Sequence, residues 1–155
     1  CAAGMAKGAK YLGQDINVYT LLGDGEIEEG EVWEAFMFAA HYKLDNLCVI
    51  IDLNGLQIDG PTEKVMNSAP VDAKMEAFGF NVITIDGHDY DQIESAFNAF
   101  RACTGRPTAI LMHTTKGKGV SYMENNVDWH GKAPNDAEYE VAMNELRAAM
   151  AELEA

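Results

Sequence analysis

The chain has 155 residues, which is enough for one domain and leaves no room for two. Its 25 Asp and Glu against 11 Lys and Arg give a net charge of −14, which disfavours binding to nucleic acid or to an anionic membrane surface. No apolar run approaches the ~18 residues of a membrane span, so we expect a single soluble domain over residues 1–155.

The first half of the chain predicts two helices, each followed by a strand. Ala2–Leu12 is rich in Ala and Lys and is followed by Gly13, as in a helix with a glycine C-cap. Val18–Leu22 is a short run of β-formers and predicts a buried strand. Gly30–Lys43 is apolar on nearly every side, so we expect a helix that is buried on more than one face, in a large core or at a subunit interface. Leu47–Asp52 predicts the second buried strand.

The start of the chain and its cysteines bear on the setting of the protein. The opening CAAGMAKGAK lacks the basic-then-apolar order of a signal peptide and reads as the middle of a helix. We therefore expect a domain that is incomplete at its N-terminus.

Cys1, Cys48 and Cys103 are odd in number and lack metal-ligand spacing, so free thiols in a reducing compartment are the simplest interpretation. This predicts a cytoplasmic location.

The second half of the chain continues the alternation of helix and strand. Asp89 and Gln92 form a predicted capping box, which would begin a helix that places Tyr90, Ile93, Phe97 and Phe100 on one face. The remaining predicted elements are a loop over Ile58–Pro70, a short helix over Asp72–Phe78 ended by Gly79, strands over Val82–Ile85 and Thr108–Met112, and a long loop over Thr114–Pro134.

The last predicted element is a helix over about residues 135–154. Asn135 is a candidate N-cap, with Glu138 three residues later. Apolar residues then recur at helical spacing, which favours core packing over contact with a partner. The stripe consists of Tyr139, Ala142, Met143, Leu146, Met150 and Leu153.

Four strands that alternate with helices predict an α/β fold with a doubly wound parallel sheet. The first two strands end in Gly23-Asp24-Gly25 and in Leu53-Asn54-Gly55. In open α/β sheets both ends lie at the carboxyl edge, where ligands bind. Asp24 and Asn54 offer the oxygen ligands that Mg²⁺ prefers, which predicts a Mg²⁺–diphosphate site. Taken alone, Gly-Asp-Gly is also ordinary turn chemistry.

The segments around these loops resemble the thiamin diphosphate-binding domain of transketolase. The resemblance rests on GDGEIEEGEVWEAFMFAAHYKLDNL, and on GLQIDGPT, AFGF, IDGHD, TTKGKGVSYMENN and WHGKAPND. It runs essentially from end to end of the chain. It implies the thiamin diphosphate-binding fold, and it implies that the first strands and helices of a complete domain are absent here.

The resemblance also assigns roles to single residues. Asp24, the amide oxygen of Asn54 and the backbone carbonyl of Leu56 would bind Mg²⁺, for which Ca²⁺ is a possible substitute. Gly23, Gly25 and Lys116 would contact the diphosphate, with Lys118 as a weaker candidate. His130 would lie near diphosphate and substrate, and Glu29 near a subunit interface that couples two active sites. Without the resemblance, His130 is an exposed loop histidine and Glu29 a helix-start acid.

The activity implied is transfer of a two-carbon ketol unit from a ketose phosphate to an aldose phosphate. The resemblance places the glutamate that activates the aminopyrimidine on a pyrimidine-binding domain, so this chain would need that partner, as a homo- or hetero-oligomer. We expect the isolated chain to be inactive. Deoxyxylulose-phosphate synthase, a 2-oxo acid dehydrogenase subunit, and a non-catalytic interaction protein with the same fold are the alternatives. A nicotinamide-binding domain is disfavoured because no GxGxxG follows a strand.

Overall fold

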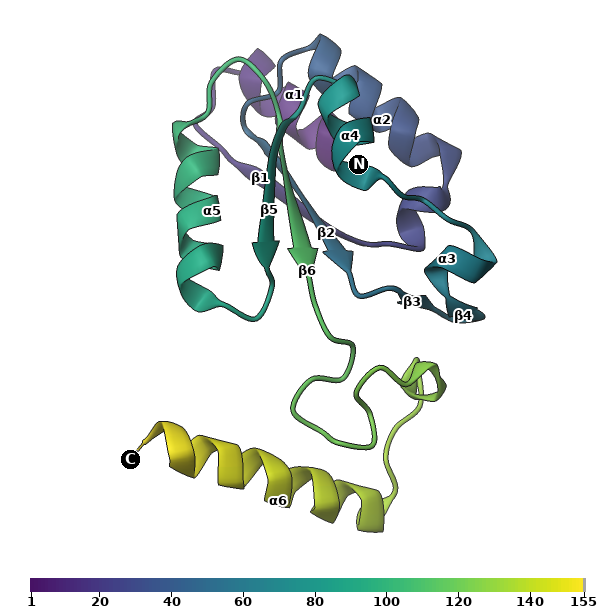
Figure 1. The fold of residues 1–155 in the computed structure, drawn as a ribbon. Helices are drawn as coiled ribbons and strands as arrows, with labels where there is room; N and C mark the ends of the chain where they lie inside the picture. Colours follow the sequence, from purple (N-terminus) through teal and green to yellow (C-terminus); the bar gives the residue numbers. More distant parts are fainter. Residues whose placement is uncertain (155) are drawn as a thin grey trace.

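A four-stranded parallel sheet forms the centre of the computed structural model, which describes residues 1–154 (Figure 1). Its strands are β1 (Val18–Gly23), β2 (Leu47–Leu53), β6 (Thr108–His113) and β5 (Asn81–Asp86), paired side by side in that order. Every neighbouring pair is parallel. The predicted strands and their direction are confirmed, and each is extended by one or two residues.

Helices cover both faces of the sheet, which confirms the doubly wound α/β fold. One face packs against α1 (Ala2–Tyr11), α2 (Gly30–His41) and α4 (Val71–Ala77), and the other packs against α5 (Tyr90–Ala102). The alternation along β2 explains this division, because Leu47, Val49 and Ile51 face the first cluster and Cys48 faces the second. Burial raises the pKa of the Cys48 thiol to about 12, in keeping with a packing role.

Parallel pairing in register brings the strand ends together at one edge. Gly23 pairs with Asp52, and Leu53 and Asp86 both pair with His113. The loops that follow β1, β2, β5 and β6 therefore all leave from this carboxyl edge. The predicted loop over residues 58–70 is partly wrong, because it contains strand β4 (Gly60–Pro61), paired with β3 (Leu56–Gln57), and helix α3 (Thr62–Val65).

Two helices that the sequence predicts to be apolar leave part of their apolar surface exposed. Helix α2 buries Phe36 and Ala39 but leaves Met37 and Phe38 exposed, so it is not enclosed within this chain. The interface alternative for this helix stays a prediction. In α5 the Asp89 side chain caps the helix by accepting from the Gln92 amide, but the Gln92 side chain accepts from the Asp86 amide instead of the Asp89 amide, so the reciprocal half of the predicted capping box is absent. However, Tyr90 is 86% exposed at the first position of α5, directly after the N-cap, so its assignment to the packed face is wrong.

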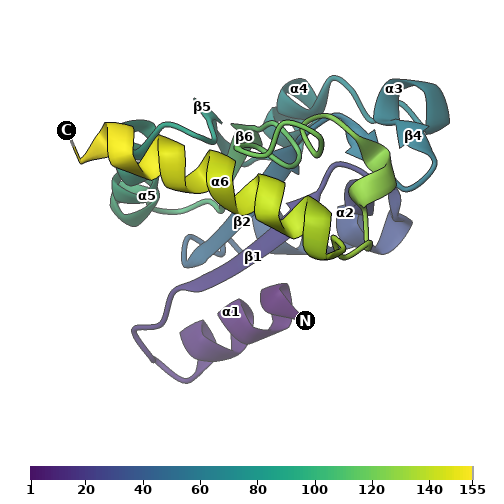
Figure 2. The same cartoon turned by 90° about the horizontal axis from the view of Figure 1, so that it is seen from below.

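The C-terminal helix α6 (Asp136–Leu153) lies across the carboxyl edge of the sheet (Figure 2). Its predicted capping box between Asn135 and Glu138 is present. Core packing of its stripe is wrong for most positions, because Ala142 is its only buried residue within the described chain, and Met150 and Leu153 are exposed. The helix contacts the preceding loop instead of the sheet. No helix within residues 1–154 is long and apolar enough to cross a membrane.

Candidate functional site

A cavity of about 780 Å³ opens at the carboxyl edge between the loops that follow β1, β2 and β6. It brings together every predicted site residue except the weaker candidate Lys118, although these residues span more than 100 positions in the chain. The predicted residues that line it are Gly23, Asp24, Gly25, Glu29, Asn54, Leu56, Lys116 and His130.

Asp24 is a buried carboxylate held by backbone amides. It is 4% exposed, and its Oδ1 accepts from the Gly25 amide at 2.9 Å and its Oδ2 from the Gly55 amide at 2.7 Å. The second bond joins the β1 and β2 loops across 31 residues of sequence. Both ion pairs within residues 1–154, Lys10–Asp45 and Lys132–Glu138, lie elsewhere. Among the residues that the structure describes, the buried Asp24 carboxylate therefore has no cationic side-chain partner.

Asn54 has its amide group oriented by hydrogen bonds at both ends. Its Oδ1 accepts from the Leu56 amide at 3.0 Å, and its Nδ2 donates to Asp52 Oδ2 at 3.1 Å. Gly55 follows with φ of +76°, a left-handed conformation that glycine adopts without strain and that turns its amide toward Asp24. One lone pair of the Asn54 oxygen is used in this arrangement, and a second is available for a ligand.

The glycines of the first loop permit close contacts. A Cβ on Gly25 would lie 2.8 Å from Gln57 Oε1 and 3.2 Å from Gln57 Cβ, so a larger residue would displace this side chain. The Gly23 amide donates to Glu26 Oε2 at 2.6 Å, and the Gly25 amide to Asp24. A phosphate oxygen would have to share or replace these carboxylate acceptors to bind the same amides.

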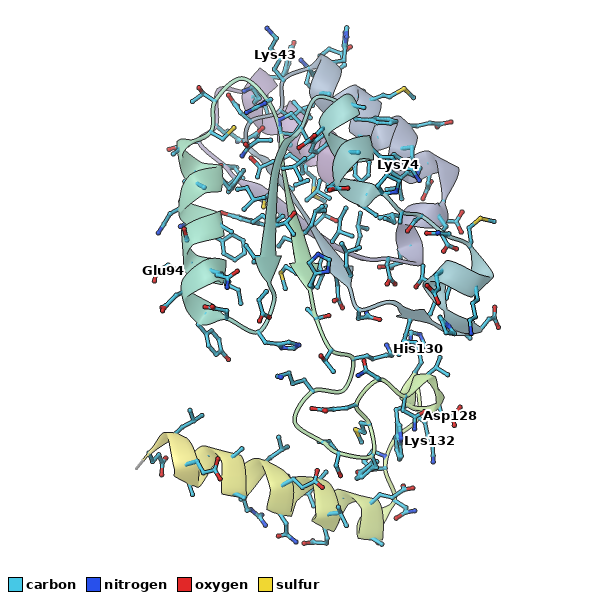
Figure 3. All side chains as sticks on the ribbon, viewed as in Figure 1. Lys43, Lys74, Glu94, Asp128, His130 and Lys132 are labelled. Atoms are coloured by element: carbon cyan, nitrogen blue, oxygen red, sulfur yellow. The ribbon has the colours of Figure 1, made fainter. Side chains whose placement is uncertain are left out.

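The segment after β6 brings Lys116 and His130 to the cavity. Figure 3 shows His130 on this segment, below the sheet. The Asn125 amide donates to the Lys116 carbonyl at 2.9 Å and folds this segment back on itself. The short helix η2 (Val127–Trp129) precedes His130, whose backbone amide donates to the Val127 carbonyl. His130 is exposed at the cavity wall and can therefore meet a ligand directly.

Glu29 lies at the junction between the short helix η1 (Glu26–Glu28) and α2. It occupies the N-cap position of α2, but its side chain makes no capping hydrogen bond. The exposed carboxylate lines the cavity, so a capping role does not account for it. Its predicted place at a subunit interface stays a prediction.

The weaker candidates lie in a second cavity of about 560 Å³ between the β5 and β6 loops. Lys118 lines this space with His113 and His88, away from Asp24 and Asn54. The His88 ring links the two loops, because its Nε2 accepts the Thr115 amide at 2.8 Å. Of the two lysines in TTKGKG, only Lys116 reaches the predicted site.

The charge of the main cavity restricts what it can bind. Five carboxylates line it, against one lysine and one histidine. A diphosphate would be repelled by these walls unless a cation lay between them. No group of three His, Cys, Asp or Glu that could hold a metal occurs in residues 1–154, but a carboxylate, an amide oxygen and a carbonyl suit Mg²⁺ and fall outside that pattern. The residues present therefore fit a Mg²⁺–diphosphate pair.

Glu26, Asp52 and Gln57 are among the residues of this cavity that sequence reasoning missed. Asp52 ends the second predicted strand, and an acid at the carboxyl end of a strand was a usable signal. Gln57 and Glu26 carried no comparable signal, because their positions depend on the β3–β4 hairpin and on η1.

Comparison with known proteins gives a consistent result. The family model for "Transketolase, thiamine diphosphate binding domain" matches residues 3–151. One apulose-4-phosphate transketolase subunit, from Phocaeicola vulgatus, is 42% identical over 151 residues, which cover 97% of this chain and 54% of that protein. Human transketolase is 43% identical over 132 residues, covering 84% of this chain and 21% of that protein. This chain thus spans about half the length of its Phocaeicola relative.

A solved structure agrees with the sequence matches. The crystal structure of transketolase from Campylobacter jejuni superimposes with a TM-score of 0.87 at 33% identity, and covers 94% of this chain and 24% of that one. The shared fold includes the parallel sheet whose carboxyl edge carries the cavity. The chain belongs to the transketolase family and corresponds to its thiamine diphosphate-binding domain.

Proposed function

We propose that this chain is the diphosphate- and Mg²⁺-anchoring part of a transketolase, which transfers a two-carbon ketol unit from a ketose phosphate to an aldose phosphate. The observation that carries the proposal is the buried Asp24 carboxylate, which is hydrogen-bonded to the Asn54 loop and has no side-chain cation beside it within residues 1–154. A buried charge of this kind is stabilised by a bound metal. The acidic cavity around it favours a metal-complexed diphosphate over a free one.

The cavity residues would then divide into metal ligands and diphosphate contacts. Asp24, the Asn54 amide oxygen and the Leu56 carbonyl would hold Mg²⁺, or Ca²⁺ as a substitute. The Lys116 ammonium would offset diphosphate charge, aided by the amides of the Gly23–Gly25 loop. Thiamin diphosphate, when bound, supplies the carbon nucleophile for cleavage and formation of the C–C bond.

His130 and Glu29 would serve the substrate side of the reaction. An imidazole at the exposed wall of the cavity can donate a hydrogen bond to a sugar phosphate or move a proton at a substrate hydroxyl. Glu29 lies at the mouth of the cavity, where a second polypeptide could meet it. We propose these as catalytic roles that require the assembled enzyme.

A second polypeptide is part of this proposal. Relatives from two bacteria are named as single subunits of apulose-4-phosphate transketolases, and such a name implies a companion chain. We propose that the companion of this chain carries a pyrimidine-binding domain and completes the active site in a homo- or hetero-oligomer. The exposed Met37 and Phe38 of α2 offer an apolar surface for such contacts. The three free thiols agree with a cytoplasmic location.

Calorimetric titration tests the proposal directly. Thiamin diphosphate and Mg²⁺ are titrated into the chain alone and into its mixture with a candidate pyrimidine-domain chain. We expect Mg²⁺-dependent binding in the mixture, lost in Asp24→Asn and retained in Asp86→Asn, a strand-end carboxylate outside the main cavity. Assays with a ketose phosphate and with pyruvate then separate transketolase from other thiamin diphosphate enzymes. Unchanged cofactor affinity in Asp24→Asn would refute the metal assignment.

A further inference from the structure

Asp52 holds two parts of the candidate site through its two carboxylate oxygens. Its Oδ2 accepts from Asn54 Nδ2 at 3.1 Å, and its Oδ1 accepts from the Thr114 hydroxyl. Its backbone carbonyl also accepts the Asp24 amide at 3.1 Å. Asp52 therefore contacts the β1 loop, the β2 loop and the segment after β6, which are the three segments that form the main cavity.

The bond to Asn54 decides which end of the side-chain amide can face a ligand. An asparagine amide can rotate by half a turn and exchange its oxygen for its NH₂ group. A carboxylate accepts hydrogen bonds only, so Asp52 selects the NH₂ group and leaves the Asn54 oxygen on the opposite side. The Leu56 amide, which donates to that same oxygen, supports this orientation.

The bond to Thr114 fixes the start of the segment that carries Lys116. Thr114 is the first residue after β6, and its amide lies 3.5 Å from the Leu53 carbonyl at the end of β2. Its hydroxyl bond to Asp52 is charge-assisted and joins residues 62 positions apart. Lys116 follows two residues later, so the Asp52 carboxylate also helps to position the backbone of Lys116.

We propose that Asp52 is a positioning residue, which orients the Asn54 amide oxygen toward the cation site and anchors the Lys116 segment against the β2 loop. The part of this inference that concerns the cation rests on the proposed function, and the part that concerns orientation does not. We assign Asp52 an indirect role because each of its carboxylate oxygens accepts a hydrogen bond from a segment that carries a site residue, Oδ2 from Asn54 and Oδ1 from Thr114. Partners of this kind typically change metal affinity 10- to 100-fold when removed.

The orientation is tested first on the metal-free chain by NMR. The side-chain NH₂ signals of Asn54 are identified by their absence in Asn54→Ala, and their exchange with solvent is measured. We expect exchange to rise at least ~5-fold in Asp52→Ala, because one hydrogen bond is lost. Asp86→Ala, which removes another strand-end carboxylate, should leave it unchanged. Equal exchange in Asp52→Ala and the unmutated chain would overturn the proposal, whatever the protein binds.

Affinity for Mn²⁺, measured by electron paramagnetic resonance with thiamin diphosphate and the partner chain present, tests the consequence. We expect roughly 10- to 100-fold weaker binding in Asp52→Ala, and a change below ~5-fold in Asp52→Asn, which can still bond both neighbours. In an Asn54→Ala background, Asp52→Ala should weaken binding much less. Equal losses in Asp52→Asn and Asp24→Asn would make Asp52 a direct ligand and overturn the positioning role. Absence of binding to the unmutated protein would refute the proposed function alone, because the NMR result stands separately.

Discussion

Replacing Trp33 with Phe should destabilise the segment that carries Gly-Asp-Gly. The indole Nε1 donates to the Ile27 carbonyl at 2.7 Å, and the ring packs against Phe36 and Phe78. Loss of the N–H leaves a part-buried carbonyl without its partner, which costs about 2 kcal/mol. The smaller ring buries ~40 Å² less apolar surface, or about 1 kcal/mol. We expect a total loss of about 3 kcal/mol and a fall in Tm of roughly 6–12 °C.

Trp129→Phe is the matched control, because Trp33 and Trp129 are the two tryptophans of the chain. The Trp129 ring packs on Tyr122 and lies under the Lys132 ammonium, and among residues 1–154 its N–H has no hydrogen-bond acceptor. Urea unfolding followed by far-UV circular dichroism should give a loss of about 1 kcal/mol for this variant. Equal losses in the two variants would refute the role assigned to the Trp33 hydrogen bond.

Three further predictions concern other parts of the chain. His130→Ala should lower turnover or donor affinity in the assembled enzyme while circular dichroism stays unchanged; unaltered kinetics would remove His130 from the site. Hydrogen bonds from Ser121 keep the pKa of Glu145 below its ordinary value of 4.5, so the contact between α6 and its loop should be complete above pH 4.5. It should weaken as the pH falls through the lowered pKa, with faster Ser121 amide exchange; Glu145→Gln should remove this pH dependence. Cys48, with its pKa raised to about 12, should resist a thiol reagent until the chain unfolds, and rapid labelling at pH 8 would contradict its burial.

The sequence was sufficient for the sheet and for the residues that its order brings together. Short β-branched runs predicted the strands, and the rule that parallel strand ends share an edge predicted that Asp24 would meet Asn54. The hydrogen bond from the Gly55 amide to Asp24 Oδ2 joins these two strand ends directly. The N-cap residues Asp89 and Asn135 could also be predicted from sequence, because capping depends on residues only three positions apart.

Features that depend on distant contacts could not be predicted in the same way. Helical periodicity showed that α6 has an apolar stripe, but periodicity does not say what covers it, and Met150 is exposed. Tyr90 is exposed at the first position of α5, which helical spacing alone does not show. The Asp52 carboxylate accepts hydrogen bonds from Asn54 and Thr114. Thr114 is 62 positions away in the sequence, so local sequence could not show the contact between Thr114 and Asp52.

The strand order has a consequence for synthesis on the ribosome. Of the four strands of this sheet within residues 1–154, β6 is the last to be made, yet it lies between β2 and β5 and pairs with both. Until residues 108–113 emerge, β5 has no partner strand among the described residues and β2 has one open edge, so the nascent chain exposes apolar strands. When β6 pairs with β2, Thr114 also comes within hydrogen-bonding distance of Asp52. The ligand cavity should therefore appear late and all at once, and slow translation before residue 108 should favour aggregation or chaperone binding.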